Sequence, residues 1–245
     1  MKNLFRLDSP FMLFLAAVWD LIVLNLLFLI CCVPIVTIGP AAVALYTCTM
    51  RMVRKEGDVG AKAFFVAFGQ NFKKSFVLWL IYIAVAVMLV VNVWLMVNSG
   101  NDYSTGIKIA CVFVLAVYAA SVSWVFPLQA RFENPVLTTL RNSLVFSIAN
   151  PLRTLCVIIC TVFPFAFLYL QTVLFLRLGW FWLLLGFAVL AYVNSMSFVK
   201  VTEKVIQKRE EIDREEAEKA AEEAELLAAA SARETEECPE ENEKA

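Results

Sequence analysis

The sequence predicts an all-α protein, a polytopic transmembrane helical bundle of about six spans with both termini in the cytoplasm. Three observations carry this prediction. Of the 245 residues, 61% are hydrophobic and the mean hydropathy is +0.74, whereas a soluble domain is about 45–50% apolar. The apolar residues fall into runs of about 20, the length that a helix needs to cross the hydrocarbon. Charge is divided too: residues 1–199 carry a net +7 (13 Lys and Arg, 6 Asp and Glu) and residues 200–245 a net −8 (8 and 16).

The first two predicted spans, residues 17–36 and 37–53, form a hairpin. The first apolar run is too long for the apolar part of a signal peptide and has no small-residue cleavage site, so we expect it to remain as a span. Pro34 breaks this helix, and Pro40 suits the first turn of the next, where its missing N–H costs nothing. The second span is only just long enough to cross before Arg51, so a re-entrant segment remains the alternative.

Two short stretches beside the spans predict amphipathic helices in the cytoplasmic interface, residues 60–74 and 136–150. In the first, Phe64, Phe65 and Phe68 alternate with polar positions at helical spacing, which is typical of a helix lying on a membrane surface. The remaining predicted spans are 75–97, 107–130, 152–176 and 180–199.

The spacing of basic residues and asparagines indicates a repeated unit. Arg51 and Asn71 are 20 residues apart, Arg131 and Asn150 are 19 apart, and each pair brackets a short helix between two spans. Such a pattern is found in transporters built from internal repeats. It also arises when two helical hairpins with basic inner loops merely look alike, and both explanations stay open.

Lys and Arg residues near the span ends predict the orientation, because these residues gather on the cytoplasmic side of a membrane. With the N-terminus inside, eleven of them face the cytoplasm and two, Lys108 and Arg177, face out. This bias would collapse if residues 37–53 did not cross. The eleven are Lys2, Arg6, Arg51, Arg54, Lys55, Lys62, Lys73, Lys74, Arg131, Arg141 and Arg153.

Residues 200–245 predict an acidic cytoplasmic tail. Glu, Ala and Lys form helices readily, and the stretch 200–232 contains neither Gly nor Pro. We therefore expect a charged helix to about residue 232 and a disordered end. Val205 and Ile212 are seven residues apart, but Lys219 interrupts the series, so a coiled coil is not predicted.

Four polar residues within the predicted spans are the candidate functional positions: Asp20, Asn25, Asn92 and Gln129. A charge in the hydrocarbon costs several kcal/mol, so one that stays there usually has a role or a partner. Asp20 lies either near the middle of the membrane or, as we favour, at its cytoplasmic boundary. The amides could line a polar path, or they could simply join packed helices by hydrogen bonds, which contribute about 0.6 kcal/mol each on average.

No catalytic, cofactor-binding or metal-binding residue is predicted, and no nucleic-acid partner. The sequence has no His, which excludes Ser–His and Cys–His nucleophile pairs and His-ligated metals. Its seven Cys contain no CxxC pair, and most lie in apolar runs, where Cys packs as a small hydrophobe. Neither a Walker-type phosphate loop nor a GxGxxG motif is present.

The first hairpin carries a specific pattern. An opening helix with Asp20 and Asn25 is followed by Pro34-Ile35-Val36-Thr37-Ile38-Gly39-Pro40-Ala41, by Ala44-Leu45-Tyr46 and by Asn71-Phe72-Lys73. This pattern resembles the YesL-like family of bacterial membrane proteins (domain of unknown function 624), and residues 17–80 carry most of the likeness. The acidic tail is outside it.

The resemblance implies a bacterial inner-membrane protein, often in the company of carbohydrate-uptake and sugar-degradation systems, with no established activity. The matching residues look structural. Pro34, Thr37, Gly39 and Pro40 would shape the helical hairpin, with Thr37 as a candidate cap of its second helix.

These observations favour a non-enzymatic membrane component, an accessory or partner subunit associated with carbohydrate uptake. Its partners would be the lipid bilayer and a membrane transport complex, contacted through the cytoplasmic face or the tail. The alternative is a small-solute transporter in its own right, which the apparent repeat supports. A polar cavity lined by Asn25, Asn92 and Gln129 would favour transport, whereas a tightly packed bundle with an exposed Phe64 and Phe68 face would favour a partner subunit.

Overall fold

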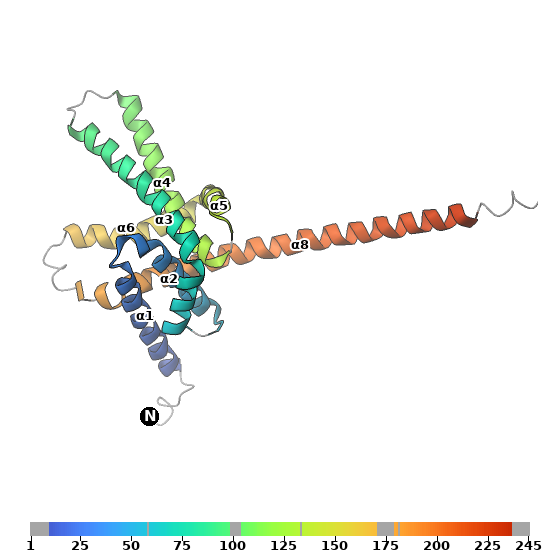
Figure 1. The fold of residues 1–245 in the computed structure, drawn as a ribbon, viewed down its shortest axis with the longest axis horizontal. Coiled ribbons are helices and arrows are strands. Elements are labelled where there is room, and N and C mark those ends of the chain that lie inside the picture. The colour runs from blue at the N-terminus through green and yellow to red at the C-terminus, as the bar shows by residue number, and fades with distance from the viewer. Residues whose placement is uncertain are drawn as a thin grey trace, which may run out of the picture. The chain divides into compact units, whose positions relative to one another are not determined.

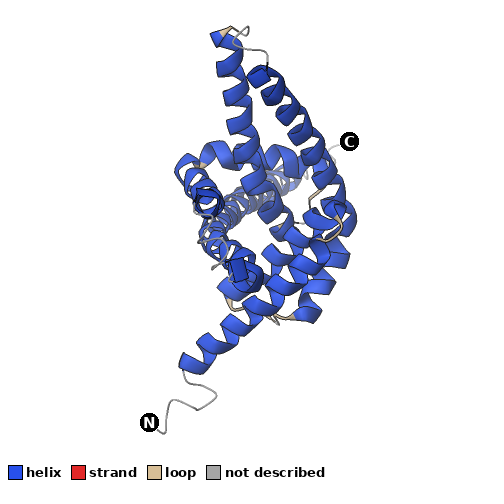
Figure 2. Ribbon diagram, turned by 90° about the vertical axis from the view of Figure 1, so that its left-hand side faces the viewer, coloured by secondary structure: helices blue, strands red, loops and turns tan. Residues whose placement is uncertain are grey.

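The structure is a computed structural model, and it describes residues 10–57, 59–98, 104–132, 134–170, 179–180 and 182–236. These residues are helical apart from short turns (Figure 2). Five of the helices are long and apolar enough to cross a membrane, and the bent pair α5 and α6 together gives up to a sixth. The expected all-helical, multi-span membrane protein is confirmed at this level. The chain divides into two compact units, Met1–Val199 and Lys200–Ala245.

The chain begins with a helical hairpin. Helix α1 (Pro10–Cys32) is followed by a 3-10 turn, η1 (Ile35–Thr37), and by α2 (Ile38–Arg54). Helix α2 ends because Lys55 adopts a left-handed conformation with φ 54°, and its N–H bonds back to the carbonyls of Arg51 and Met52. A turn of this kind satisfies the last carbonyls of a helix, which have no partner within it.

Helix α3 (Ala61–Asn98) is one continuous helix of 38 residues, where the sequence predicted an interfacial helix 60–74 and a separate span 75–97. No proline interrupts it, and a ladder of aromatic rings runs through the expected boundary. Ring centroids in this ladder are 5.4–6.4 Å apart, a spacing at which aromatic pairs attract. The ladder consists of Phe64, Phe68, Phe72 and Phe76.

Helices α4 (Thr105–Arg131), α5 (Val136–Ala149) and α6 (Pro151–Leu170) follow. Helices α5 and α6 meet at 103°, because Pro151 lacks an N–H and disfavours a helical conformation at Asn150, whose φ is −130° and ψ 61°. The two proposed repeat units therefore differ: the first continues into one unbroken helix, whereas the second breaks at the proline. The end of the predicted span 152–176 lies outside the described residues.

The last helices are a short π-helix (Trp182–Gly186) and α8 (Phe187–Glu236). The sequence predicted a span 180–199 and a separate tail helix to about residue 232. The structure has one helix of 50 residues, since the stretch contains neither Gly nor Pro. The predicted disordered end, residues 237–245, lies outside the described residues.

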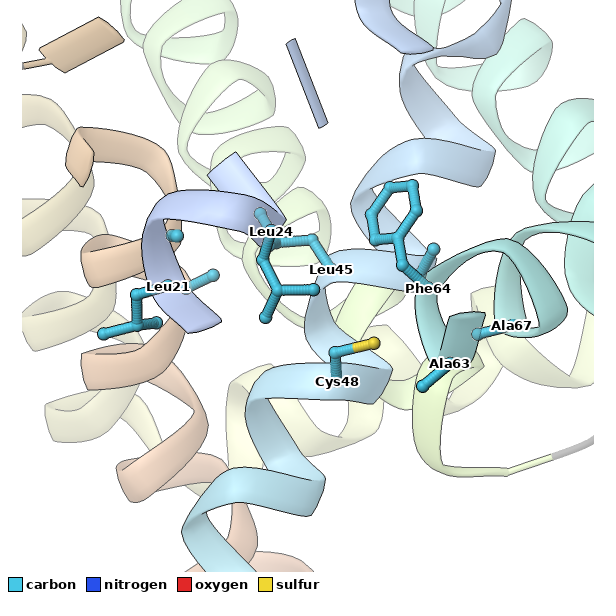
Figure 3. Packing of buried hydrophobic residues seen from close by; sticks show 10 residues of the cluster. Leu21, Leu24, Leu45, Cys48, Ala63, Phe64 and Ala67 are labelled. Atoms are coloured by element: carbon cyan, nitrogen blue, oxygen red, sulfur yellow. The ribbon is translucent and has the colours of Figure 1, made fainter. Parts of the chain in front are cut away.

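Helix α2 lies at the centre of the first unit and belongs to two apolar clusters. In the first cluster, Leu24 of α1, Cys48 of α2 and Phe64 of α3 are fully buried (Figure 3). In the second, Val43 of α2 packs with Leu78 of α3 and with α4. Half of the apolar stretch of α2 is buried, although its mean hydropathy of 1.3 is the lowest of the five candidate spans. The hydropathy of α2 is low because the helix packs against other helices through small residues, which let helices approach closely in membranes.

Candidate functional site

The four polar residues singled out in the sequence lie on three helices and are not joined to one another by any hydrogen bond described. Asp20 and Asn25 lie on α1, Asn92 on α3 and Gln129 on α4. Asp20 is half-buried and Asn92 is exposed, whereas Asn25 is fully buried and Gln129 is 1% exposed. The structure therefore separates two buried amides from two positions that are open to the surroundings.

Asn25 joins the first helix of the chain to the last. Its side-chain oxygen Oδ1 accepts a hydrogen bond of 2.9 Å from the backbone N–H of Ala188, in the first turn of α8. Ala188 directly follows the π-helix Trp182–Gly186, at the point where the helical hydrogen-bond pattern changes to that of α8. Asn25 thus pairs a backbone N–H at this junction from 163 residues away, and no local sequence signal could reveal this.

Gln129 joins α4 to α5. Its Oε1 accepts a hydrogen bond of 2.9 Å from the Thr139 hydroxyl, while its Nε2 is buried without a hydrogen-bond partner among the described residues. An unpaired buried donor costs about 1–3 kcal/mol. The side-chain oxygen of Gln129 is therefore paired in this packing, whereas its NH2 group is not.

A line of buried hydroxyls forms the polar face of α5, and sequence inspection missed it. Thr139, Ser143 and Ser147 recur every four residues on the face toward α4 and are at most 7% exposed. The Ser143 hydroxyl lies 2.9 Å from that of Ser121 on α4, which in turn bonds to Tyr82 of α3. The four-residue spacing of Ser and Thr was the available signal. Opposite this face, α5 exposes Leu137 and Ile148, each 79% exposed, as a helix against lipid would.

Two further polar pairs hold α8 and α6 to the bundle. The Thr49 hydroxyl of α2 lies 2.8 Å from that of Ser195 in α8, and both residues are fully buried. The indole N–H of Trp124 in α4 donates to the Thr154 hydroxyl of α6 at 2.8 Å. All these groups are uncharged at neutral pH, so the arrangement suits helix association rather than acid–base chemistry. Among the described residues, no three His, Cys, Asp or Glu come together as possible metal ligands.

The tip of the α1–α2 hairpin contains the expected hairpin-shaping residues. The Thr37 hydroxyl donates to the backbone carbonyls of Cys31 and Pro34, and it makes no capping bond to α2. The expected cap is therefore wrong: the side chain closes the end of α1, because those carbonyls are within its reach. On the other side of the tip, the indole N–H of Trp79 in α3 donates to the carbonyl of Ile35 at 2.8 Å.

Gly39 and Pro40 lie just below the tip, in the first turn of α2, and both are buried. A Cβ on Gly39 would lie 2.5 Å from the Trp79 Cβ and 2.8 Å from the Ser75 carbonyl oxygen. Only glycine allows so close an approach of two helices. Pro40 sits where its missing N–H needs no partner. The hairpin motif is thus built to receive α3.

Residues 21–93 match the family model "Protein of unknown function, DUF624". The resemblance found in the sequence is confirmed over this segment, which contains the hairpin tip, α2 and α3 as far as Val93. No curated protein and no solved structure matches the chain. The DUF624 segment therefore coincides with the part in which Thr37, Gly39 and Trp79 interlock.

Two cavities along the helices have apolar walls. One of about 520 Å³ lies between α3 and α4, lined by residues such as Leu89, Val93 and Leu115. The other, about 310 Å³, lies between α4, α5 and α6, lined by Val117, Ile148 and others. Neither is lined by the candidate residues Asn25, Asn92 or Gln129. Such walls suit hydrocarbon, since they offer a sugar few hydrogen-bond partners.

Proposed function

We propose that this protein is a non-catalytic accessory component of a membrane transport complex for carbohydrates, held in a bacterial inner membrane. The observation that carries the proposal is the use of its buried polar groups. Asn25, Thr49 and Trp124 each form a bond from one helix to another. Polar groups used in this way stabilise a packed bundle, whereas a solute pathway needs polar groups facing a shared space.

The alternative, a solute transporter in its own right, draws less support. A transporter would have a polar cavity lined by Asn25, Asn92 and Gln129, whereas the two cavities described are apolar. The exposed Phe64 and Phe68 face expected of a partner subunit is not found either, because Phe64 is fully buried. The surface for a partner must therefore be sought elsewhere.

The orientation that we propose has both termini in the cytoplasm. Eleven Lys and Arg residues then face the cytoplasm and two face outside, in agreement with the bias found in membrane proteins. The acidic tail would also be cytoplasmic, where soluble subunits of a transport complex are available to it.

The tail offers the second unit of the chain as a contact surface. From Glu203 to Glu222 nearly every residue is exposed, including Val205 and Ile212, which are 41% and 44% exposed at a spacing of seven residues. Residues 200–245 carry a net charge of −8. A cytoplasmic partner with a basic surface and an apolar strip would complement this helix, because opposite potentials guide association.

A crosslinking pull-down from native membranes tests the proposal. The full chain is compared with a chain truncated after Lys200 and with a control chain truncated after Glu236, which keeps α8 complete. We expect a subunit of a carbohydrate transporter to co-purify with the full chain and the control, and to be lost with the shorter chain. Recovery of the protein alone from all three would contradict the accessory role and direct attention to solute flux.

A further inference from the structure

We propose that the α1–α2 hairpin does not cross the membrane twice but is re-entrant: it enters from the cytoplasmic side, turns in the cytoplasmic leaflet and returns. The inference rests on the orientation proposed above, with the N-terminus inside. It changes the number of complete crossings to four, by α3, α4, α6 and α8, and leaves the position of both termini unchanged.

The level of the hairpin tip along α3 is the first argument. The bond from Trp79 to the Ile35 carbonyl fixes the tip beside Trp79, and α3 continues to Asn98. At 1.5 Å per residue these nineteen residues span about 28 Å, close to the whole hydrocarbon thickness of about 30 Å. Both views show the paired ends of α3 and α4 running well past α2 (Figures 1 and 2).

The part of α3 beyond the tip has the composition of a membrane span. Residues 80–97 contain no charge, and Met88, Val90 and Val97 are each at least 67% exposed. Such a surface belongs in hydrocarbon. Lys74, the last charge before this run, lies five residues before Trp79, a rise of about 8 Å. The tip therefore ends about 8 Å inside the cytoplasmic boundary and far from the outer face.

The chemistry of the tip is the second argument. Ile30, Val33, Ile35 and Val36 are 66%, 81%, 68% and 45% exposed, so the most exposed side chains of the turn are apolar. The other connection, between α3 and α4, has the sequence Asn-Ser-Gly-Asn-Asp-Tyr-Ser-Thr-Gly (98–106), which is typical of a turn in water. An exposed apolar turn is favourable only where acyl chains surround it.

The backbone of the tip is the third argument, because non-helical backbone at membrane depth needs its polar groups paired. The break in the helix is short, and side chains supply donors within it. The Thr37 hydroxyl donates to the carbonyls of Cys31 and Pro34, and Trp79 donates to that of Ile35. The Thr37 N–H also bonds to the Pro34 carbonyl at 3.0 Å. A turn in water would obtain these bonds from solvent.

The charges agree with a shallow hairpin. The N-terminal basic residues and the cluster at Arg51, Arg54 and Lys55 stay cytoplasmic whether the hairpin crosses twice or turns back, so the charge bias does not decide between the two. Asp20 lies twelve residues before Cys32, about 18 Å along α1. A tip about 8 Å deep therefore takes this carboxylate out of the hydrocarbon, where a charge is costly, and it places the exposed apolar side chains of Phe11, Phe14 and Trp19 in the membrane interface.

Cysteine accessibility tests the inference. Single cysteines are placed at the tip (Val33→Cys), at the start of α4 (Ser104→Cys) and after α2 (Glu56→Cys), each in the full chain with its seven native cysteines replaced by Ala. A membrane-impermeant maleimide is added to right-side-out and then to inverted vesicles. We expect Ser104→Cys to react only from outside and Glu56→Cys only from the cytoplasmic side. Val33→Cys should react from neither until detergent dissolves the membrane.

The outcomes separate the hairpin from the orientation. Reaction of Val33→Cys from outside, together with Ser104→Cys, would mean two full crossings. Its reaction from the cytoplasmic side would mean a tip in water, and either result overturns the inference. Reversed labelling of Ser104→Cys and Glu56→Cys would refute the orientation itself. In the otherwise native chain, Val33→Asp should lower the Tm and Ser104→Asp should not; equal effects of the two would also count against the proposal.

Discussion

The indole N–H of Trp79 lies 2.8 Å from the carbonyl oxygen of Ile35, although 44 residues separate them. This bond joins the middle of α3 to the tip of the first hairpin. Helices in membranes gain little from burial against each other, since lipid is as apolar as their side chains. A polar bond between helices, which contributes about 0.6 kcal/mol on average in membranes, therefore helps to fix the position of the hairpin.

Replacement of Trp79 by Phe should destabilise the protein. Phe retains an aromatic ring but cannot donate, so the Ile35 carbonyl loses its donor, and the expected loss is about 0.6 kcal/mol, the average for such bonds in membranes. In a chain of this size each kcal/mol lowers the Tm by about 2–4 °C. The measurement is thermal unfolding in detergent, followed by the helical circular dichroism signal.

Trp94→Phe is the matched control for this substitution. Trp94 lies on the same helix and is 63% exposed, so its replacement should change the Tm very little. If both variants had the same Tm as the parent, the Trp79 bond would not hold the hairpin.

Gly39→Ala and Gly69→Ala should act in opposite directions. A Cβ at position 39 would lie 2.5 Å from the Trp79 Cβ, and the helices would have to separate, which typically costs about 1–3 kcal/mol. At position 69, inside α3, a Cβ would have nothing within 4 Å, and Ala should stabilise the helix by about 0.5–1 kcal/mol. The Tm of each variant is compared with that of the parent protein, and we expect a lower value for Gly39→Ala and a higher one for Gly69→Ala. A Gly39→Ala protein as stable as the parent would refute the close approach of α2 to α3 at Gly39.

The helices themselves could be predicted from sequence, because long apolar runs and prolines determine them. The predicted span 107–130 corresponds to α4 (Thr105–Arg131), and the predicted short helix 136–150 to α5 (Val136–Ala149). The continuity of α3 could not be predicted in the same way. Of the Phe residues that suggested a surface helix, Phe64 is fully buried by tertiary contacts and Phe68 is half-buried, whereas Phe65 is 52% exposed.

The polar contacts were harder still to predict. Asn25 and Gln129 stand out in the sequence as amides within apolar runs, and both are buried, but their partners depend on packing between distant helices. The Asn25 bond reaches across 163 residues and that of Thr49 across 146. A single sequence contains no local signal for either pairing, whereas the spacing of the α5 hydroxyls was visible and was overlooked.

Asn25→Leu and Asn92→Leu should separate structural from surface amides. Leu at position 25 leaves the Ala188 N–H without its acceptor, and we expect a loss of about 1–3 kcal/mol. Asn92 is exposed on an apolar helix, so Leu should leave the Tm unchanged or raise it slightly. Urea or thermal unfolding in detergent measures both. Should Asn92→Leu impair complex formation at unchanged stability, Asn92 would belong to an interaction surface.

A double-mutant cycle should detect the bond between Thr49 and Ser195. The variants are Thr49→Val, Ser195→Ala and both together, and the expected coupling is about 0.6 kcal/mol, the average for such bonds in membranes. Thr47→Val provides the control cycle, because the Thr47 hydroxyl bonds to Val43 in its own helix at 2.8 Å. Equal coupling in both cycles would mean that the hydroxyl pair does not join α2 to α8.

Gln129→Met should be neutral or stabilising, although it removes a buried hydrogen bond. The bond to Thr139 contributes about 1 kcal/mol, whereas the unpaired Nε2 costs about 1–3 kcal/mol. The Thr139 hydroxyl keeps a second acceptor, the Pro135 carbonyl at 3.2 Å, so it is not left unpaired. Met has nearly the shape of Gln and fills the same space.

Gln129→Glu should lower the stability of the protein, in contrast to Gln129→Met at the same site. Burial disfavours the charged form of a carboxylate at this position, so the variant must either lose this charge or disrupt the local packing. We expect a clear loss of Tm for Glu and none for Met, measured side by side in detergent. If Met destabilised the protein as strongly as Glu, the Nε2 would have to be paired in the native state, and the seam between α4 and α5 would contain a bound water or a further polar group.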